Sequence, residues 1–158
     1  MRRKEMEKKI IIRKAIQNDV PAIVRLLSDD MLGSKREVSG QDIPQSYYNA
    51  FIAINNDPNQ FLAVAEIDGK VIGTLQISYI PNMSYQGATR ALLEGVLVDS
   101  ALRSKGIGQH MIKWAIAEAK SKGCRFVQLT TNKQRKDAHR FYRRLGFVAS
   151  HEGFKLDL

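Results

Sequence analysis

Two β-rich runs, at residues 61–67 and 70–80, are separated only by Asp68 and Gly69, and this spacing constrains the fold more than any other local feature. An Asp-Gly pair is a preferred sequence for the two-residue type I′ turn that joins neighbouring antiparallel strands. The pattern therefore predicts a β-hairpin. A third β-rich run follows at residues 88–98, after a polar loop at 81–87, so we expect a further strand there.

The rest of the chain alternates between strand and helix patterns. Asn18, Asp19 and Pro21 favour the start of a helix. We expect strands at residues 10–15 and 126–131, helices that begin near residue 19, at Pro44 and near Ile107, a helix at 137–145, and two short strands in 147–158 that turn at Glu152 and Gly153. A chain of 158 residues suits one compact domain, which we place at residues 10–158 after a basic, flexible extension at 1–9.

Positive charge is concentrated in the C-terminal half. Residues 103–144 carry twelve basic side chains against only Glu118 and Asp137, in a protein whose formal net charge is +9. Such a segment favours contact with phosphate groups, and a solvated basic face is the alternative.

Composition also disfavours several kinds of site. Cys124 is the single cysteine, so no disulfide forms within the chain and a zinc site built on paired cysteines is excluded. His110, His139 and His151 lack metal-ligand spacing, and we expect no metal. No apolar run approaches the ~20 residues of a membrane span, and the N-terminal segment has no apolar stretch of signal-peptide length, so we expect a soluble, cytoplasmic protein.

The segment Arg103-Ser104-Lys105-Gly106-Ile107-Gly108 lies between a predicted strand and a predicted helix. Backbone N–H groups at a helix N-terminus bind phosphate, and glycine allows close approach. No Lys-Ser/Thr pair follows Gly108, so the segment is not a P-loop, and Met111 replaces the third glycine of the dinucleotide fingerprint. Pyrophosphate binding is consistent with both exclusions.

Together with Val96-Leu97-Val98-Asp99 and the run Ala138–Phe147, this segment resembles the GNAT superfamily of N-acetyltransferases over nearly the whole chain. The resemblance implies an α/β (α+β) fold: a mixed central sheet of six to seven strands, about four flanking helices, and acetyl-CoA between splayed fourth and fifth strands. The pyrophosphate is expected on the N–H groups of residues 104–109, and the pantetheine arm on the backbone of 96–98. The implied cofactor-binding residues are Val96, Leu97, Val98, Arg103, Ser104, Lys105, Gly106, Ile107, Gly108, Gln109, Asn132 and Tyr142.

Aminolysis of a thioester requires a base, because a primary amine of pKa ~10.4 is protonated at neutral pH. We expect Glu94 to be that base, on one strand face with Leu92, Val96 and Val98, where it would be partly desolvated. A bulge at Gly95 would free backbone N–H groups for the tetrahedral intermediate. From the resemblance, Tyr142 is the proton donor to the leaving thiolate.

Each assignment has a structural alternative. Glu94 could pair with Arg90, Tyr142 could be a core residue, and Asn132 could be a helix cap. Arg103 and Lys105 could simply be solvated. We expect Cys124 to be a core residue and His139 to have a structural role.

The acceptor is expected to be an amine of a small molecule or peptide, and the hypothesis is that a cationic one is favoured. The residues behind this hypothesis are Asp29, Asp30, Glu37, Asp42, Tyr47, Tyr48 and Tyr85. Two other functions stay open: a CoA-binding regulator without catalysis, and a nucleic-acid-binding module that uses the basic half. A homodimer is possible, and a nucleic-acid partner is the less favoured reading.

Overall fold

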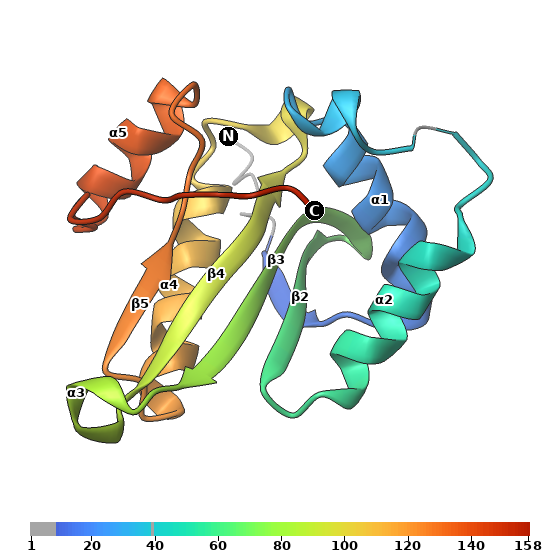
Figure 1. Ribbon diagram of the computed structural model, residues 1–158. Coiled ribbons are helices and arrows are strands. Elements are labelled where there is room, and N and C mark those ends of the chain that lie inside the picture. The colour runs from blue at the N-terminus through green and yellow to red at the C-terminus, as the bar shows by residue number, and fades with distance from the viewer. Residues whose placement is uncertain (1–8, 39) are drawn as a thin grey trace.

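The computed structural model describes residues 9–38 and 40–158 and shows helices on both faces of one twisted sheet (Figure 1). The strand order is β1-β2-β3-β4-β5; β1 to β4 are antiparallel, and β5 runs parallel to β4. The elements are β1 (Ile11–Lys14), α1 (Val20–Ser28), α2 (Gln45–Asn56), β2 (Gln60–Ile67), β3 (Lys70–Pro81), α3 (Ser84–Gly87), β4 (Thr89–Val98), α4 (Ile107–Ser121), β5 (Phe126–Leu129) and α5 (Lys136–Arg144), with 3-10 turns at Gln17–Asp19, Gly33–Lys35 and Ser100–Leu102.

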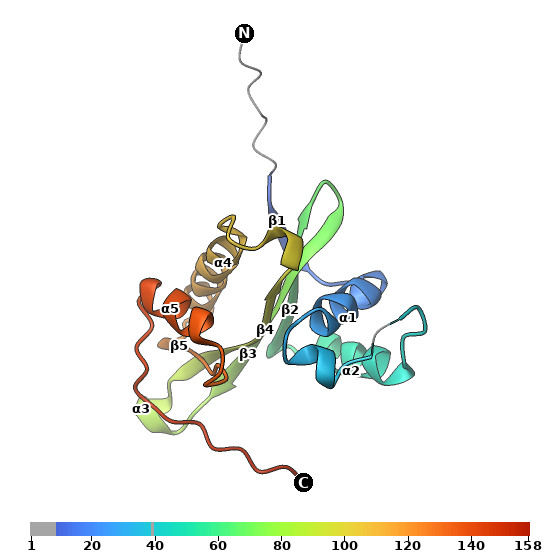
Figure 2. The same cartoon turned by 90° about the horizontal axis from the view of Figure 1, so that it is seen from above.

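The two faces of the sheet have separate apolar cores. Helix α4 covers one face, and α1 and α2 cover the other (Figure 2). Met111, Ile112 and Ala115 of α4 pack with the first core, and Ile23, Val24 and Phe51 of α1 and α2 with the second. Residues at intervals of three or four lie on one side of a helix, so each helix buries one apolar stripe.

The predicted hairpin is confirmed. Strands β2 and β3 pair up to Ile67 and Lys70, and both turn residues have positive φ, 52° at Asp68 and 77° at Gly69. Positive φ at both positions is the conformation of a type I′ turn.

The bulge expected at Gly95 is also present, but the expected alternation of side chains along β4 is wrong. Glu94 pairs with Gln76, whereas Leu97 pairs with Thr74, so β4 holds one residue more than β3 between these pairs. The additional residue shifts the alternation by one position. Val96 and Val98 therefore pack in the α4 core and Leu97 in the α1 and α2 core, while Glu94 is exposed.

The two strands expected in residues 147–158 are absent from the described chain, which accounts for a sheet of five strands instead of six to seven. The tail extends away from α5 and contains no helix or strand (Figures 1 and 2). Its Phe154 is 95% exposed. A two-stranded hairpin is marginally stable unless it pairs or packs with other elements. Only Phe147 of the tail packs against the core, and residues 148–158 are all exposed. Strand β5 also ends at Leu129, two residues earlier than expected.

Most of the predicted N-terminal extension, residues 1–8, lies outside the described residues. None of the helices in the described ranges has the length and apolar character needed to cross a membrane.

Candidate active site

Strands β4 and β5 stop pairing before the bulge at Gly95 and well before the end of β4. They pair only from Arg90 with Phe126 to Leu93 with Leu129, whereas β4 continues to Val98. The edge of β4 beyond Leu93 is therefore not paired with β5, as the splayed strands of the predicted fold require. An unpaired strand edge offers backbone N–H and C=O groups to an extended ligand.

The bulge places Gly95 in this unpaired stretch with a φ of 57°. No atom lies within 4 Å of a Cβ built at this position, so the site has room for a side chain but a backbone conformation that favours glycine. The bulge interrupts the ladder between β3 and β4, which leaves backbone groups there available to a substrate.

Glu94 is exposed, so the partial desolvation expected for it is wrong for this structure. The proposed structural pairing with Arg90 is not found either, because Arg90 Nη1 donates instead to Asn82 Oδ1 at 2.5 Å. Within residues 9–38 and 40–158, no ion pair or hydrogen bond of the Glu94 carboxylate is present. The carboxylate is thus accessible to an incoming group.

The glycine-containing segment forms the turn that starts α4, as expected. Ser104 and Gly106 have φ of 63° and 80°, and α4 begins at Ile107. Arg103 and Lys105 are both exposed. These two basic residues directly precede the start of α4, and an anion is favoured at the N-terminus of a helix.

The start of α4 lies close to both β4 and α5. A Cβ built on Gly108 would be 3.5 Å from the Phe141 ring and 3.8 Å from the Val98 side chain. Arg103 Nε donates to Val98 O at 3.4 Å, and that carbonyl is one of the groups expected to pair with pantetheine. The structure therefore brings together three of the sequence motifs.

Tyr142 lies beside this junction in an aromatic cluster. Its ring is 5.1 Å from Phe141 and 5.7 Å from Phe147, measured between centroids. Burial raises the pKa of the Tyr142 hydroxyl, and the charge of Arg135 opposes that rise. Tyr142 thus packs against the core, as the structural alternative for this residue proposed. Its hydroxyl stays protonated at neutral pH.

Arg135 makes a connection that the sequence did not reveal. Its guanidinium donates to both oxygens of Asp30, one of them at 2.7 Å, across 105 positions of the chain. The Asp30 carboxylate is buried and also accepts the N–H groups of Leu32 and Gly33. Its pKa is lowered to about 2, chiefly by the hydrogen bonds from Arg135, although burial opposes this. We call this the Asp30–Arg135 pair; it joins the end of α1 to the start of α5.

The helix-cap role considered for Asn132 is not found, because α5 has Arg135 at its N-cap and no side-chain cap hydrogen bond, whereas His139 of α5 does make a structural contact. Asn132 Oδ1 accepts the Gln134 N–H at 2.9 Å, and the His139 ring lies 3.0 Å from the Asn132 carbonyl oxygen. The Asn132 amide nitrogen is on an exposed residue, so a contact with CoA stays a prediction.

The acidic and aromatic residues expected to select the acceptor do not form one open cluster. Asp30 is engaged by Arg135, and Glu37 accepts from Arg36 at 3.0 Å and from the Tyr47 hydroxyl at 2.5 Å. Tyr85 lies in α3, at the start of β4, whereas the bulge is near its end (Figure 1).

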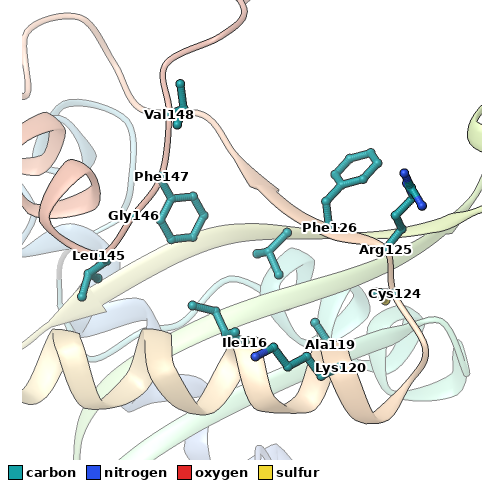
Figure 3. Close-up of a pocket in the computed structure, with 11 residues that line it drawn as sticks. Ile116, Ala119, Lys120, Cys124, Arg125, Phe126, Leu145, Gly146, Phe147 and Val148 are labelled. Carbon is teal, nitrogen blue, oxygen red and sulfur yellow. The ribbon is translucent and has the colours of Figure 1, made fainter.

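Two cavities are present near the sheet. One of about 360 Å³ lies between α4, β5 and residues 145–148, and none of the predicted site residues lines it (Figure 3). The other, of about 150 Å³, lies between α1, α2 and the sheet, and Gly95 forms part of its wall. The smaller cavity is therefore the one adjacent to the bulge.

Comparison with known proteins adds evidence independent of this geometry. The model of the Acetyltransferase (GNAT) family matches residues 21–147. An aminoalkylphosphonate N-acetyltransferase of Salmonella typhimurium is 32% identical over 110 residues, which make up 70% of this chain and 71% of that protein.

Solved structures with the same fold are also found. A crystal structure described as a transcriptional regulator from Bacillus halodurans is 47% identical, with a TM-score of 0.92 over 95% of this chain and 100% of that one. A predicted acetyltransferase from Clostridium acetobutylicum, solved with acetyl-CoA, has a TM-score of 0.72 at 20% identity, over 94% of this chain and 96% of that one. The second likeness concerns the fold alone.

Proposed function

This chain belongs to the Acetyltransferase (GNAT) family, and we propose that it transfers the acetyl group of acetyl-CoA to a primary amine of a small molecule or peptide, by direct attack in a ternary complex. The observation that carries the proposal is the unpaired, bulged edge of β4 beside the glycine-containing start of α4.

The proposed cofactor site follows from these two features. The backbone of Val96, Leu97 and Val98 pairs with the amides of the pantetheine arm as an additional strand would. The N–H groups from Ser104 through Gln109 bind the pyrophosphate, with help from the charges of Arg103 and Lys105. Arg103 has to leave the Val98 carbonyl for this pairing, and its 3.4 Å hydrogen bond on the protein surface is weak enough to allow that. Asn132 is a further proposed contact.

The reaction needs a neutral amine at the start and a protonated thiol at the end. We assign Glu94 as the base that takes the ammonium proton, directly or through one water. The amine nitrogen then bonds to the carbonyl carbon. N–H groups freed near Gly95, Val96 and Leu97 stabilise the negative oxygen of the tetrahedral intermediate.

Collapse of that intermediate breaks the C–S bond and releases a thiolate, comparable to a thiol of pKa ~8.5. Tyr142 donates the proton that the sulfur takes up, and the second proton that the nitrogen loses as the amide forms restores the Tyr142 hydroxyl. Its place in the aromatic cluster fixes the ring, and the positive charge of Arg135 stabilises the phenolate left behind. Arg135 is itself held in position by Asp30.

The first experiment is calorimetric titration of the protein with acetyl-CoA and with CoA, followed by a thiol-release assay over a panel of amines. Binding of both nucleotides and amine-dependent release of CoA support the proposal. Binding without release for any amine supports a CoA-binding regulator.

Nucleic-acid binding has to be tested as well, because one similar structure is described as a transcriptional regulator. Tight, strongly salt-dependent binding of an oligonucleotide, with no binding of acetyl-CoA, would overturn the enzyme in favour of the nucleic-acid-binding module.

A further inference from the structure

The cavity of about 150 Å³ beside the β4 bulge has an almost wholly apolar wall. Four residues of α1 and four of α2 line it, all of them apolar except Tyr47, and the sheet contributes Leu62, Thr74, Gln76 and Gly95. Gly95 follows Glu94 in the chain, and Gln76 pairs with Glu94 across the ladder, so two residues of the wall adjoin the proposed base.

The polar side chains in this wall already have partners. The Thr74 hydroxyl donates to a backbone carbonyl oxygen of β2 at 2.8 Å, and the Gln76 amide donates to Gln60 at 2.9 Å. The Tyr47 hydroxyl donates to Glu37 at 2.5 Å. A phosphonate, phosphate or sugar placed here would lose its water against a wall with few free hydrogen-bonding groups, which is unfavourable.

The volume limits the size of an apolar occupant. A dry protein cavity of about 150 Å³ lined by Leu, Ile and Phe is large enough to hold benzene. The cavity therefore suits a phenyl ring or an alkyl chain of about six carbon atoms, with its attachment point toward the bulge.

We propose that this cavity is the acceptor subsite, and that it takes the apolar end of an alkylamine or arylalkylamine whose primary amine then lies beside Glu94. The inference rests on the proposed function and adds the class of substrate. It also separates this chain from its relative that is named for aminoalkylphosphonates.

The test compares 2-phenylethylamine, hexylamine, ethylamine and 2-aminoethylphosphonate, first for binding to the protein saturated with CoA and then for turnover with acetyl-CoA. We expect the two larger apolar amines to bind and react at least roughly ten-fold better than ethylamine, since a site of this kind discriminates apolar groups by about 10- to 200-fold. Equal or better performance of the phosphonate overturns the inference.

A matched pair of variants on α2 locates the effect. Ala50 and Ala53 are both exposed, but only Ala50 lines the cavity. We expect A50L to fill the cavity and weaken 2-phenylethylamine binding by roughly ten-fold, and A53L to change it less than two-fold, with acetyl-CoA affinity unchanged in both. If both variants behave alike, the cavity is not the subsite. Failure of the parent protein to bind acetyl-CoA would refute the proposed function instead.

Discussion

At the scale of single residues, Glu94 and Tyr142 have contrasting surroundings. The carboxylate is exposed on a bulged strand, whereas the phenol is held in a cluster of three aromatic rings. A base has to reach water or an amine, and a proton donor has to keep its proton until the sulfur takes it. The two environments suit these two roles.

For Glu94 we predict that E94Q lowers kcat by roughly a hundred-fold, because the variant keeps the shape of the side chain and removes the base. Acetyl-CoA affinity, measured by titration, should stay within two-fold of the parent. E152Q, on the exposed tail, serves as the control and should be fully active. An active E94Q enzyme would mean that another group takes the proton.

For Tyr142 we predict that Y142F lowers kcat by roughly a hundred-fold and leaves acetyl-CoA binding intact. Because burial raises the pKa of this hydroxyl above the ordinary 10.0, any loss of activity due to its ionisation should have its midpoint above pH 10 in the parent. The comparison is a pH profile of kcat for both proteins, with Y85F in the distant α3 as the control. Undiminished kcat in Y142F would leave Tyr142 as a packing residue.

At the scale of elements, the Asp30–Arg135 pair holds the end of α1 against the start of α5. Both halves of the candidate site depend on this contact, since α1 lines the small cavity and α5 carries Tyr142. Gly33 makes the local turn possible, because a Cβ there would lie only 1.9 Å from the Leu27 carbonyl oxygen.

The pair should contribute stability that depends on pH. The pKa of Asp30 falls from 3.8 to about 2 on folding, so its contribution is fully present above pH 3.8 and is lost as the pH falls through about 2. We predict that D30N lowers the free energy of unfolding by about 2 kcal/mol at pH 7.

The measurement is urea unfolding of D30N, D29N and the parent at several pH values. Asp29 is exposed, and its replacement should change stability by less than about 0.5 kcal/mol. The difference between D30N and the parent should shrink between pH 4 and pH 2. A constant difference over this range would show that the charge of Asp30 is not what stabilises the fold.

Local patterns predicted the elements better than their connections. The Asp-Gly turn, the glycine turn before α4 and the bulge at Gly95 are each encoded by a few neighbouring residues. The Asp30–Arg135 pair depends on residues 105 positions apart, and no short pattern indicates it. The predicted orientation of the β4 side chains was wrong beyond Gly95, because simple alternation does not allow for the additional residue in the bulge.

At the scale of the whole molecule, the proposed cofactor site includes residues of β4, α4 and α5, so its ligand should stabilise the entire fold. We predict that acetyl-CoA at about 100 times its Kd adds about 2.7 kcal/mol. For a domain of this size, that corresponds to a rise in Tm of roughly 5 to 10 °C. Thermal unfolding with acetyl-CoA, CoA, ATP and an oligonucleotide is the measurement, and a rise with the oligonucleotide alone would contradict the proposal.

The order of helices and strands was predicted up to α5 except for α3, which lies in the segment expected to be a loop at 81–87, and the tail was not predicted. The alternating apolar residues near the C-terminus favour a strand, but a strand also needs a neighbour, and β5 is the last strand of the described sheet. Phe154, Leu156 and Leu158 are all exposed in consequence.

The bulge has a consequence for what a single-codon deletion would do. Glu94 pairs with Gln76 and Leu97 with Thr74, so removal of Gly95 alone would leave an unbroken ladder with Val96 opposite Leu75 and every later side chain on its present face. The sheet does not need this residue. We predict that the deletion variant melts no lower than the parent and yet has lost turnover, which thermal unfolding and the thiol-release assay can check together. Gly95 is then an insertion that the reaction requires and the fold does not. A gene without this codon would encode a regular β4 strand and an inactive protein.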